Sequence, residues 1–298
     1  RNTFVMGSPA AWHDSKDSNT LRVMTWNVQG FSNYLRAKKS RVAFRTNRDS
    51  ILATISEFNP GIICFQDYRN IENAKRRISI RKQLDSMGYT FYFSSHDRIG
   101  TMPKNPAVTI EEGVAIYSRF PIIDSGRINI NNEDKNENLA WIDIDFNNKP
   151  LRVITAHLKS FTIYKDTAQR AEKDENIYEI TYKRRRAAEY KIRETEVFHE
   201  KEAKVISNFI NTADKPVIYC GDLNITPTSY NYHLIRGDKL NDAFTEKGWW
   251  LGNTFSKIVP TLRIDVCLPD KEFSVQQAKR EKRKLSDHYP VIADMKWK

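Results

Sequence analysis

Short apolar segments alternate with polar stretches along most of the chain, and most of these segments have the length of a β-strand. They are rich in Val, Ile, Tyr, Phe and Trp, which fit the pleated, half-buried surface of a sheet. Nine runs of this kind predict strands, at residues 21–28, 61–67, 89–95, 112–124, 139–146, 151–160, 215–222, 261–269 and 288–297.

Helical spacing of apolar residues occurs in two places. Ile51, Leu52, Ile55 and Phe58 recur at the spacing of one helix face, and Pro60 stands just past the expected end. A charged segment from about 166 to 211 predicts one long helix or two with a solvated outer face. Many short strands with intermittent helices are typical of two packed sheets flanked by helices, an α+β sandwich.

The chain has the size of a single domain. Its 298 residues are 40% hydrophobic, enough for a substantial core, and contain neither a repeat nor a low-complexity linker. We expect one domain at residues 21–298, preceded by a loose, irregular arm at residues 1–20.

Positive charge narrows the class of partner. The formal net charge of +11 favours an anionic partner such as nucleic acid, an anionic lipid surface or a phosphorylated small molecule. The densest basic runs are "KRRR" at 183–186, interpreted as a solvated helix face, and "KREKRK" at 279–284. The second run leads directly into "LSDHYP", which predicts a flexible basic loop beside the residues of that motif.

The cysteines indicate neither a disulfide framework nor a zinc site. Cys64, Cys220 and Cys267 each lie inside an apolar run, and no two of them have metal-ligand spacing. We therefore expect three reduced cysteines in the core. The chain starts at Arg1 and not at Met, so the sequence leaves open whether an upstream signal or anchor was removed, and leaves the compartment open too.

Polar residues recur where the predicted strands end. A single strand-end carboxylate is ordinary, and Gly, Asp, Asn and Pro in "CGDLNITP" also favour a simple turn. Five such clusters are harder to explain as turns, because a buried carboxylate is unfavourable by several kcal/mol unless something pairs with it. A cation together with a phosphate substrate would supply the pairing. The clusters are Asn27, Gln66 with Asp67, His157, Asp222 with Asn224, and Asp287 with His288, while Asp265 lies within a run.

Seven stretches in a fixed order resemble the endonuclease/exonuclease/phosphatase family, which has the deoxyribonuclease I-like fold. They are "TWNVQGF", "IICFQD", "EGVAIYSRFPI", "TAHLKS", "GDLNITP", "RIDVCL" and "SDHYPV". The resemblance runs from Leu21 nearly to the C-terminus. One stretch, "GDLNITPTSYNYHLI", is similar to stretches in sphingomyelinase-like and deadenylase-like members and in unassigned bacterial proteins. The resemblance to the family implies a four-layer α/β sandwich of two mainly antiparallel sheets, and hydrolysis of phosphoesters with a divalent cation, Mg²⁺ or Mn²⁺.

The resemblance also implies residue roles. Asn27, Asp67 and Asp287 match the metal-side positions. Asp222 matches the carboxylate that orients or deprotonates the attacking water, and Asn224 matches its phosphate-contacting neighbour.

Two histidine–carboxylate pairs are expected at the phosphate. One consists of His288 with Asp265 and the other of His157 with Glu112. No covalent nucleophile is suggested by the sequence, so we expect direct attack by water on the phosphorus.

One position departs from the family pattern, which usually has Gln-Glu where this chain has Gln66-Asp67. Aspartate is one methylene shorter, and Mg²⁺ accepts water in place of a missing ligand. We expect altered metal binding, with a catalytically weakened polyanion-binding domain as the non-enzyme alternative.

The substrate stays open. A nuclease-like phosphodiesterase is the first hypothesis, and a sphingomyelinase-like lipid phosphodiesterase or a small-phosphate phosphatase is the alternative. We expect a monomer with a phosphoester substrate, nucleic acid or anionic lipid being candidates, and no protein partner can be inferred.

Overall fold

A computed structural model describes residues 12–31, 41–73, 79–103, 105–131, 137–160, 195–249, 252–256 and 262–298. Three of the sequence predictions fall wholly or partly outside these residues. They are the arm at 1–11, the helical segment at 166–194 and the "KRRR" run.

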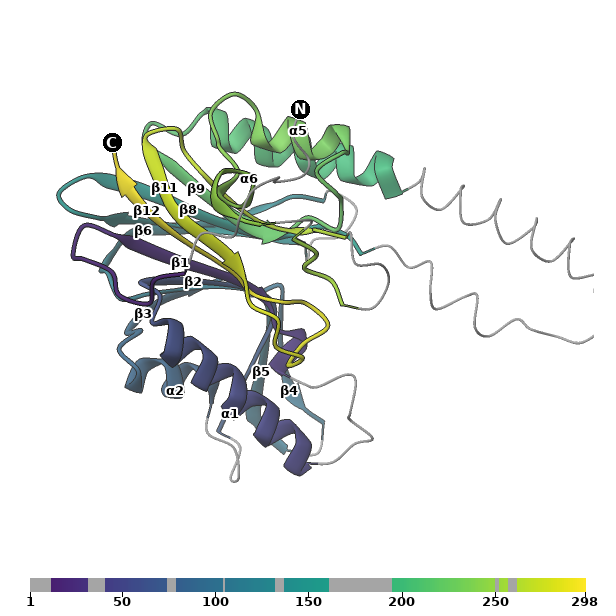
Figure 1. Cartoon of the computed structure of the whole chain (residues 1–298). Coiled ribbons are helices and arrows are strands. Elements are labelled where there is room, and N and C mark those ends of the chain that lie inside the picture. The colour runs from purple at the N-terminus through teal and green to yellow at the C-terminus, as the bar shows by residue number, and fades with distance from the viewer. Residues whose placement is uncertain are drawn as a thin grey trace, which may run out of the picture.

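Two packed sheets form the centre of the molecule (Figure 1). In the seven-stranded sheet the order is β11-β12-β1-β2-β5-β3, and β4 also pairs with β5. Its strands are β1 (Leu21–Asn27), β2 (Ile62–Glu72), β3 (Phe91–Ser94), β4 (Arg98–Met102), β5 (Asn105–Ser118), β11 (Phe273–Arg280) and β12 (Val291–Trp297).

The five-stranded sheet has the order β10-β9-β8-β7-β6. Its strands are β6 (Ile122–Asn129), β7 (Asn138–Asp145), β8 (Pro150–His157), β9 (Val217–Asp222) and β10 (Asp265–Pro269). Each sheet contains one parallel pair, β1 with β2 and β8 with β9, and the other pairings are antiparallel.

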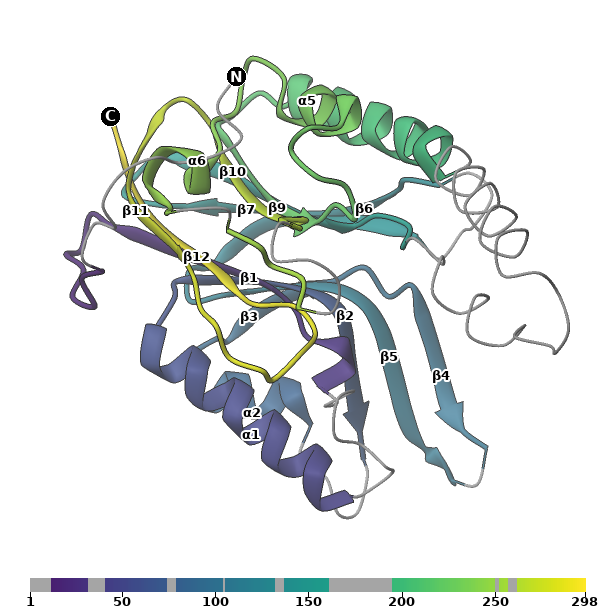
Figure 2. The same cartoon turned by 45° about the vertical axis from the view of Figure 1, so that its right-hand side comes forward.

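Helices cover the two outer faces, which gives four layers (Figure 2). Helices α1 (Arg41–Phe58) and α2 (Ile80–Ser86) pack on the seven-stranded sheet. A helix at 195–211 and α5 (Tyr230–Arg236) pack on the five-stranded sheet, while α6 (Ala243–Lys247) lies against β10 and β11. The predicted α+β sandwich is confirmed.

Alternation along the strands explains how one chain supplies three apolar layers. Successive side chains of a strand point to opposite faces. In β9, Ile218 and Cys220 therefore join the core between the sheets, whereas Val217 and Tyr219 join the core beneath the helix at 195–211. The three cysteines are free and buried, as expected.

Helix α1 follows directly from its sequence pattern. Ile51, Leu52, Ile55 and Phe58 all lie in the core between the helices and the seven-stranded sheet. The helix ends at Phe58, and the next residue, Asn59, has a φ of 44° in the left-handed region that Asn tolerates after a helix C-terminus.

Two surface segments are held to the body of the protein more closely than expected. Residues 12–20 have little regular structure but are held to the body, because Lys296 Nζ lies 2.6 Å from Asp17 Oδ2 and His13 N donates to Gln277 Oε1 at 2.9 Å. The basic run at 279–284 begins as the end of β11, and Arg283 Nη2 lies 2.6 Å from Glu57 Oε1 on α1. It is therefore not a free loop, although Lys282 and Lys284 are exposed.

Within the described parts of the chain, no helix combines the length and apolar character needed to cross a membrane.

Candidate active site

The topology brings one end of five strands to the same edge of the sandwich. Strands β1 and β2 are parallel and pair Asn27 with Gln66, so Asp67, inside β2, lies close to the end of β1. Strands β8 and β9 are parallel, so His157 lies beside Asp222. Asp265 begins the antiparallel strand β10 and pairs in register with Asp222. His288 lies in the loop that enters β12, next to the end of β1.

Asp222 is the centre of this cluster. Its side chain is fully buried, and its Oδ2 accepts a hydrogen bond from Asn27 Nδ2 of the opposite sheet at 3.0 Å. Two imidazoles face the same oxygen, with His157 Nε2 at 3.5 Å and His288 Nδ1 at 3.6 Å. The other oxygen, Oδ1, accepts the backbone N–H of Asn224 at 3.0 Å.

The predicted pairing of His288 with Asp265 is present. His288 Nδ1 lies 2.9 Å from Asp265 Oδ2 and 3.1 Å from Oδ1. Burial alone would lower the pKa of His288, but the carboxylates of Asp265 and Asp222 outweigh it and raise the pKa to about 10. In this protein the ring is therefore an imidazolium at neutral pH. Its Nε2 faces Asp287 Oδ1 at 4.0 Å.

The predicted pairing of His157 with Glu112 is absent. His157 Nδ1 instead faces Asp67 Oδ1 at 3.4 Å, whereas Glu112 Oε1 accepts from Arg69 Nε at 2.6 Å. The reason lies in the register, since Arg69 is directly opposite Glu112 on neighbouring strands.

Asp67 reaches His157 through a β-bulge. The sequence pattern predicts Asp67 at a strand end, but β2 continues to Glu72. The register of β2 against β5 shifts between Phe65 and Tyr68. Asp67 has a φ of 47° in this bulge, so Gln66 points into the core and Asp67 points out toward the site.

The two groups shift each other's pKa. Burial raises the pKa of Asp67, but the charges of His157 and His288 outweigh it and hold the pKa at about 2. Burial lowers the pKa of His157, but Asp67 and Asp222 outweigh it and raise the pKa to about 9. His157 Nε2 is buried and has no hydrogen-bond partner among the described residues.

The charge balance of the cluster suits a divalent cation. Four carboxylates, those of Asp67, Asp222, Asp265 and Asp287, carry four formal negative charges, and the two imidazolium rings offset two of them. Three of these carboxylates are buried and Asp67 is 49% exposed, and a buried charge without a partner is unfavourable by several kcal/mol. Carboxylate and amide oxygens are also the donors that Mg²⁺ and Mn²⁺ prefer.

Two sets of residues could hold such an ion. Asp222, Asp265 and His288 offer ligand atoms that all lie within 4.8 Å of one another. In this set, however, His288 Nδ1 already binds Asp265 through a proton. Asn27, Asp67 and Asp287, the predicted metal side, offer oxygen donors only, and their role stays a prediction.

The Asn224 side-chain amide is already hydrogen-bonded to the protein backbone. Its Nδ2 donates to Leu158 O at 2.8 Å and its φ is 51°, a conformation that Asn adopts more readily than most residues. The predicted phosphate contact of Asn224 also stays a prediction.

The supporting roles of three residues escaped sequence analysis, because each role depends on partners that are distant in the chain. Thr254 Oγ1 accepts the N–H groups of Ile264 and Asp265, each at 3.0 Å, and so fixes the start of β10. Gln66 Nε2 bridges the sheets by donating to Thr25 Oγ1 at 3.0 Å and Thr155 Oγ1 at 2.9 Å.

Asp97 is the third. It accepts from Asn138 Nδ2 at 2.7 Å, and burial raises its pKa to about 6. It packs against Gly113, where an added Cβ would stand only 2.4 Å from Ser95 Oγ.

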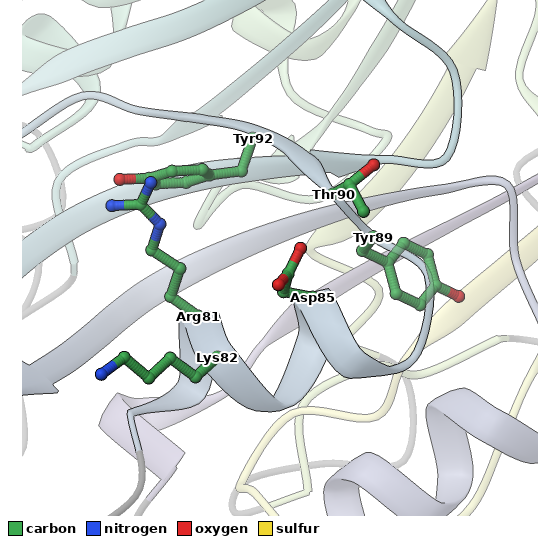
Figure 3. A pocket seen from close by; sticks show the side chains of 6 residues that line it. All are labelled: Arg81, Lys82, Asp85, Tyr89, Thr90 and Tyr92. Carbon is green, nitrogen blue, oxygen red and sulfur yellow. The ribbon is translucent and has the colours of Figure 1, made fainter.

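A small hollow lies away from this cluster. Figure 3 shows the side chains that line it, from α2, β3 and the turn between them. The hollow has a volume of about 130 Å³. The Arg81 guanidinium lies over the Tyr92 ring at 4.2 Å. None of the candidate catalytic residues lines this hollow, and it is not the active site.

Comparison with known proteins decides the family. The model of the endonuclease/exonuclease/phosphatase family matches residues 24–288, nearly the whole chain. The chain belongs to the endonuclease/exonuclease/phosphatase family. Members of this family are generally hydrolases that act on phosphoesters and use divalent metals. A search of curated proteins finds no match to this sequence.

Solved structures of the family share the fold. An endonuclease/exonuclease/phosphatase from Beutenbergia cavernae superposes with a TM-score of 0.64 at 19% identity, covering 94% of this chain and 72% of that one. The human Nocturnin catalytic domain with bound sulfate gives 0.61 at 17% identity, covering 94% of each chain. A humanized D. rerio TDP2 gives 0.62 at 15% identity, covering 93% and 99%.

Proposed function

We propose that this protein is a divalent-metal-dependent phosphodiesterase of the nuclease-like kind, which hydrolyses its substrate by direct attack of water. The observation that carries the proposal is the position of Asp222. Its buried carboxylate lies between two imidazole rings and bridges to Asn27 of the opposite sheet.

The chain's own residues supply most of the chemistry. Asp222 aligns the attacking water and accepts its proton. His157 and His288, held as imidazolium ions, donate hydrogen bonds to the phosphoryl oxygens and stabilise the charge that develops on them. Asp67 and Asp265 orient these two rings.

A Mg²⁺ or Mn²⁺ ion bound by Asn27, Asp67 and Asp287 would add Lewis-acid stabilisation of the phosphoryl group. The single-strand DNA product bound in a D. rerio TDP2 structure makes a nucleic acid the first substrate to test. The net charge of +11 agrees with a polyanionic substrate.

The test is a turnover panel with Mg²⁺, Mn²⁺ or a chelator. The substrates are single-stranded DNA, duplex DNA, RNA, sphingomyelin vesicles, phosphoinositides and bis-p-nitrophenyl phosphate. We expect metal-dependent cleavage of a nucleic acid and of the chromogenic diester, both lost on chelation. Cleavage of sphingomyelin alone would favour the lipid alternative, and binding of DNA without turnover under any condition would refute the enzyme.

A further inference from the structure

A buried polar cluster lies behind the active site, on the outer face of the five-stranded sheet. Two of its members, His199 and Glu202, come from the helix at 195–211, and both side chains are buried. Neither takes part in the proposed chemistry. Both contact the peptide groups of a single residue, Lys159, in the segment that follows β8.

The helix holds Lys159 at both of its backbone groups. Glu202 Oε2 accepts the Lys159 N–H at 3.4 Å, and His199 Nε2 donates to the Lys159 carbonyl oxygen at 2.8 Å. Burial lowers the pKa of His199, so the neutral ring with a proton on Nε2 is the form that makes this bond. The Lys159 side chain also lies on the helix, with Nζ 3.7 Å from the centre of the Phe198 ring.

The held segment is continuous with the catalytic cluster. Lys159 is two residues from His157, and the intervening Leu158 donates its N–H to Asp222 O at 3.0 Å. Leu158 O accepts from Asn224 Nδ2 at 2.8 Å, and Asn224 N in turn donates to Asp222 Oδ1. A shift of the Lys159 peptide would therefore move residues on both sides of Asp222.

Glu202 has a second carboxyl group beside it. Burial is the main cause that raises the pKa of Glu202 to about 8, and the negative charge of Glu137 raises it further. The hydrogen bond from the Lys159 N–H and the positive charge of His157 lower the pKa of Glu202. Tyr219, on the face of the sheet beneath the helix, also faces Glu202. His199, on the same helix as Glu202, is neutral at pH 7 and above.

We propose that Glu202 and His199 are positioning residues for the hydrolytic reaction, which clamp the Lys159 peptide and thereby hold His157 and Asn224 in place around Asp222. This inference rests on the proposed function. Protonated Glu202 is neutral beside the charge of Glu137 while its Oε2 accepts the Lys159 N–H. Ionised Glu202 repels Glu137, so the clamp loosens as the pH rises through about 8.

The decisive variant is Glu202→Gln, because the amide keeps an acceptor for the Lys159 N–H and stays neutral beside Glu137, but has no acidic proton to lose. The measurement is kcat and KM from pH 6 to 10 on the substrate that the metal panel identifies. Glu200→Gln is the matched control, since Glu200 lies on the same helix in an exposed ion pair with Lys204.

We expect wild-type kcat to fall above pH 8, and Glu202→Gln to keep kcat within about threefold at pH 7 while losing that inflection. His157 ionises in both proteins, so the difference between the two profiles isolates Glu202. Glu202→Leu should lower kcat at least about tenfold at pH 7 with little change in KM, because the clamp acts on geometry and not on substrate contacts.

Identical pH profiles for Glu202→Gln and the wild type would overturn the inference, and this comparison decides even if Glu202→Leu does not fold. If none of the Glu202 variants alters turnover, the inference of a clamp is refuted and the proposed function still stands. If the wild type shows no metal-dependent turnover on any substrate, both the clamp and the proposed function are refuted.

Discussion

Replacing Asp265 with Asn should lower the pKa of His288 and change how stability depends on pH. His288 Nδ1 has Asp265 at 2.9 Å and Asp222 at 3.6 Å, and its pKa of about 10 lies above its ordinary value of 6.5. A raised histidine pKa stabilises the fold fully below pH 6.5, and this stabilisation is lost as the pH rises through about 10. At about 1.4 kcal/mol per unit, the shift corresponds to about 5 kcal/mol.

Removing the nearer carboxylate should reduce this shift substantially. A neighbouring opposite charge changes a pKa by roughly 1–3 units, so the variant ring should titrate near pH 8. The variant should then be less stable than the wild type at pH 6 by up to about 3 kcal/mol, because removing the buried charge of Asp265, whose pKa burial raises, offsets part of the loss. The difference should vanish as the pH rises from about 8 to about 10.

The assay combines urea unfolding at several pH values with NMR titration of the His288 ring, both in the presence of a chelator. Asp145→Asn is the matched control, because Asp145 is exposed at the end of β7 away from the site. A wild-type His288 that titrates near 6.5, or a variant with the wild-type titration, would refute the reasoning.

Two further predictions concern the metal and the basic run. Asp67→Glu should preserve or raise Mg²⁺-dependent turnover, because the longer side chain restores the family's reach to the ion; loss of turnover would show a site rebuilt around aspartate. Lys282→Gln with Lys284→Gln should raise KM for a polyanion and flatten its salt dependence, because fewer counterions are released on binding. This double variant leaves the ion pair between Arg283 and Glu57 intact, and an effect of similar size on a small chromogenic diester would contradict it.

The strand and helix pattern predicted most of the fold because each core strand carries its apolar residues in a continuous run. β4 escaped prediction since all five of its residues are exposed and Arg98 and Gly100 break the run. β11 escaped for a related reason, because it ends in Lys279 and Arg280, whose charges indicate a loop. Such strands form because a neighbouring strand supplies hydrogen bonds, and this neighbour cannot be predicted from the local sequence.

Motif order was enough to bring together Asp222, predicted at a strand end, and the pair of His288 with Asp265, which was predicted within an apolar run. The partner of His157 was not predictable, because it depends on a bulge in β2 that turns Asp67 toward the site. A one-residue bulge leaves no mark in the apolar pattern. Glu202 was likewise hidden, since a single Glu in a charged helix looks solvated until the helix is docked on the sheet.

Asp222→Asn is the most direct test of the proposed reaction. Asn keeps the shape of Asp222 and its bond from the Asn224 N–H, but it removes the charge and the basicity. Single-turnover and steady-state rates on the identified diester, with saturating Mg²⁺ and Asp145→Asn as the control, should show turnover lower by at least about 10²-fold, within the range of general acid–base groups. The melting temperature, measured alongside, reports whether the variant folds. Near-wild-type turnover in a folded, metal-binding variant would contradict the proposed role and leave Asp222 as a structural residue of the turn after β9.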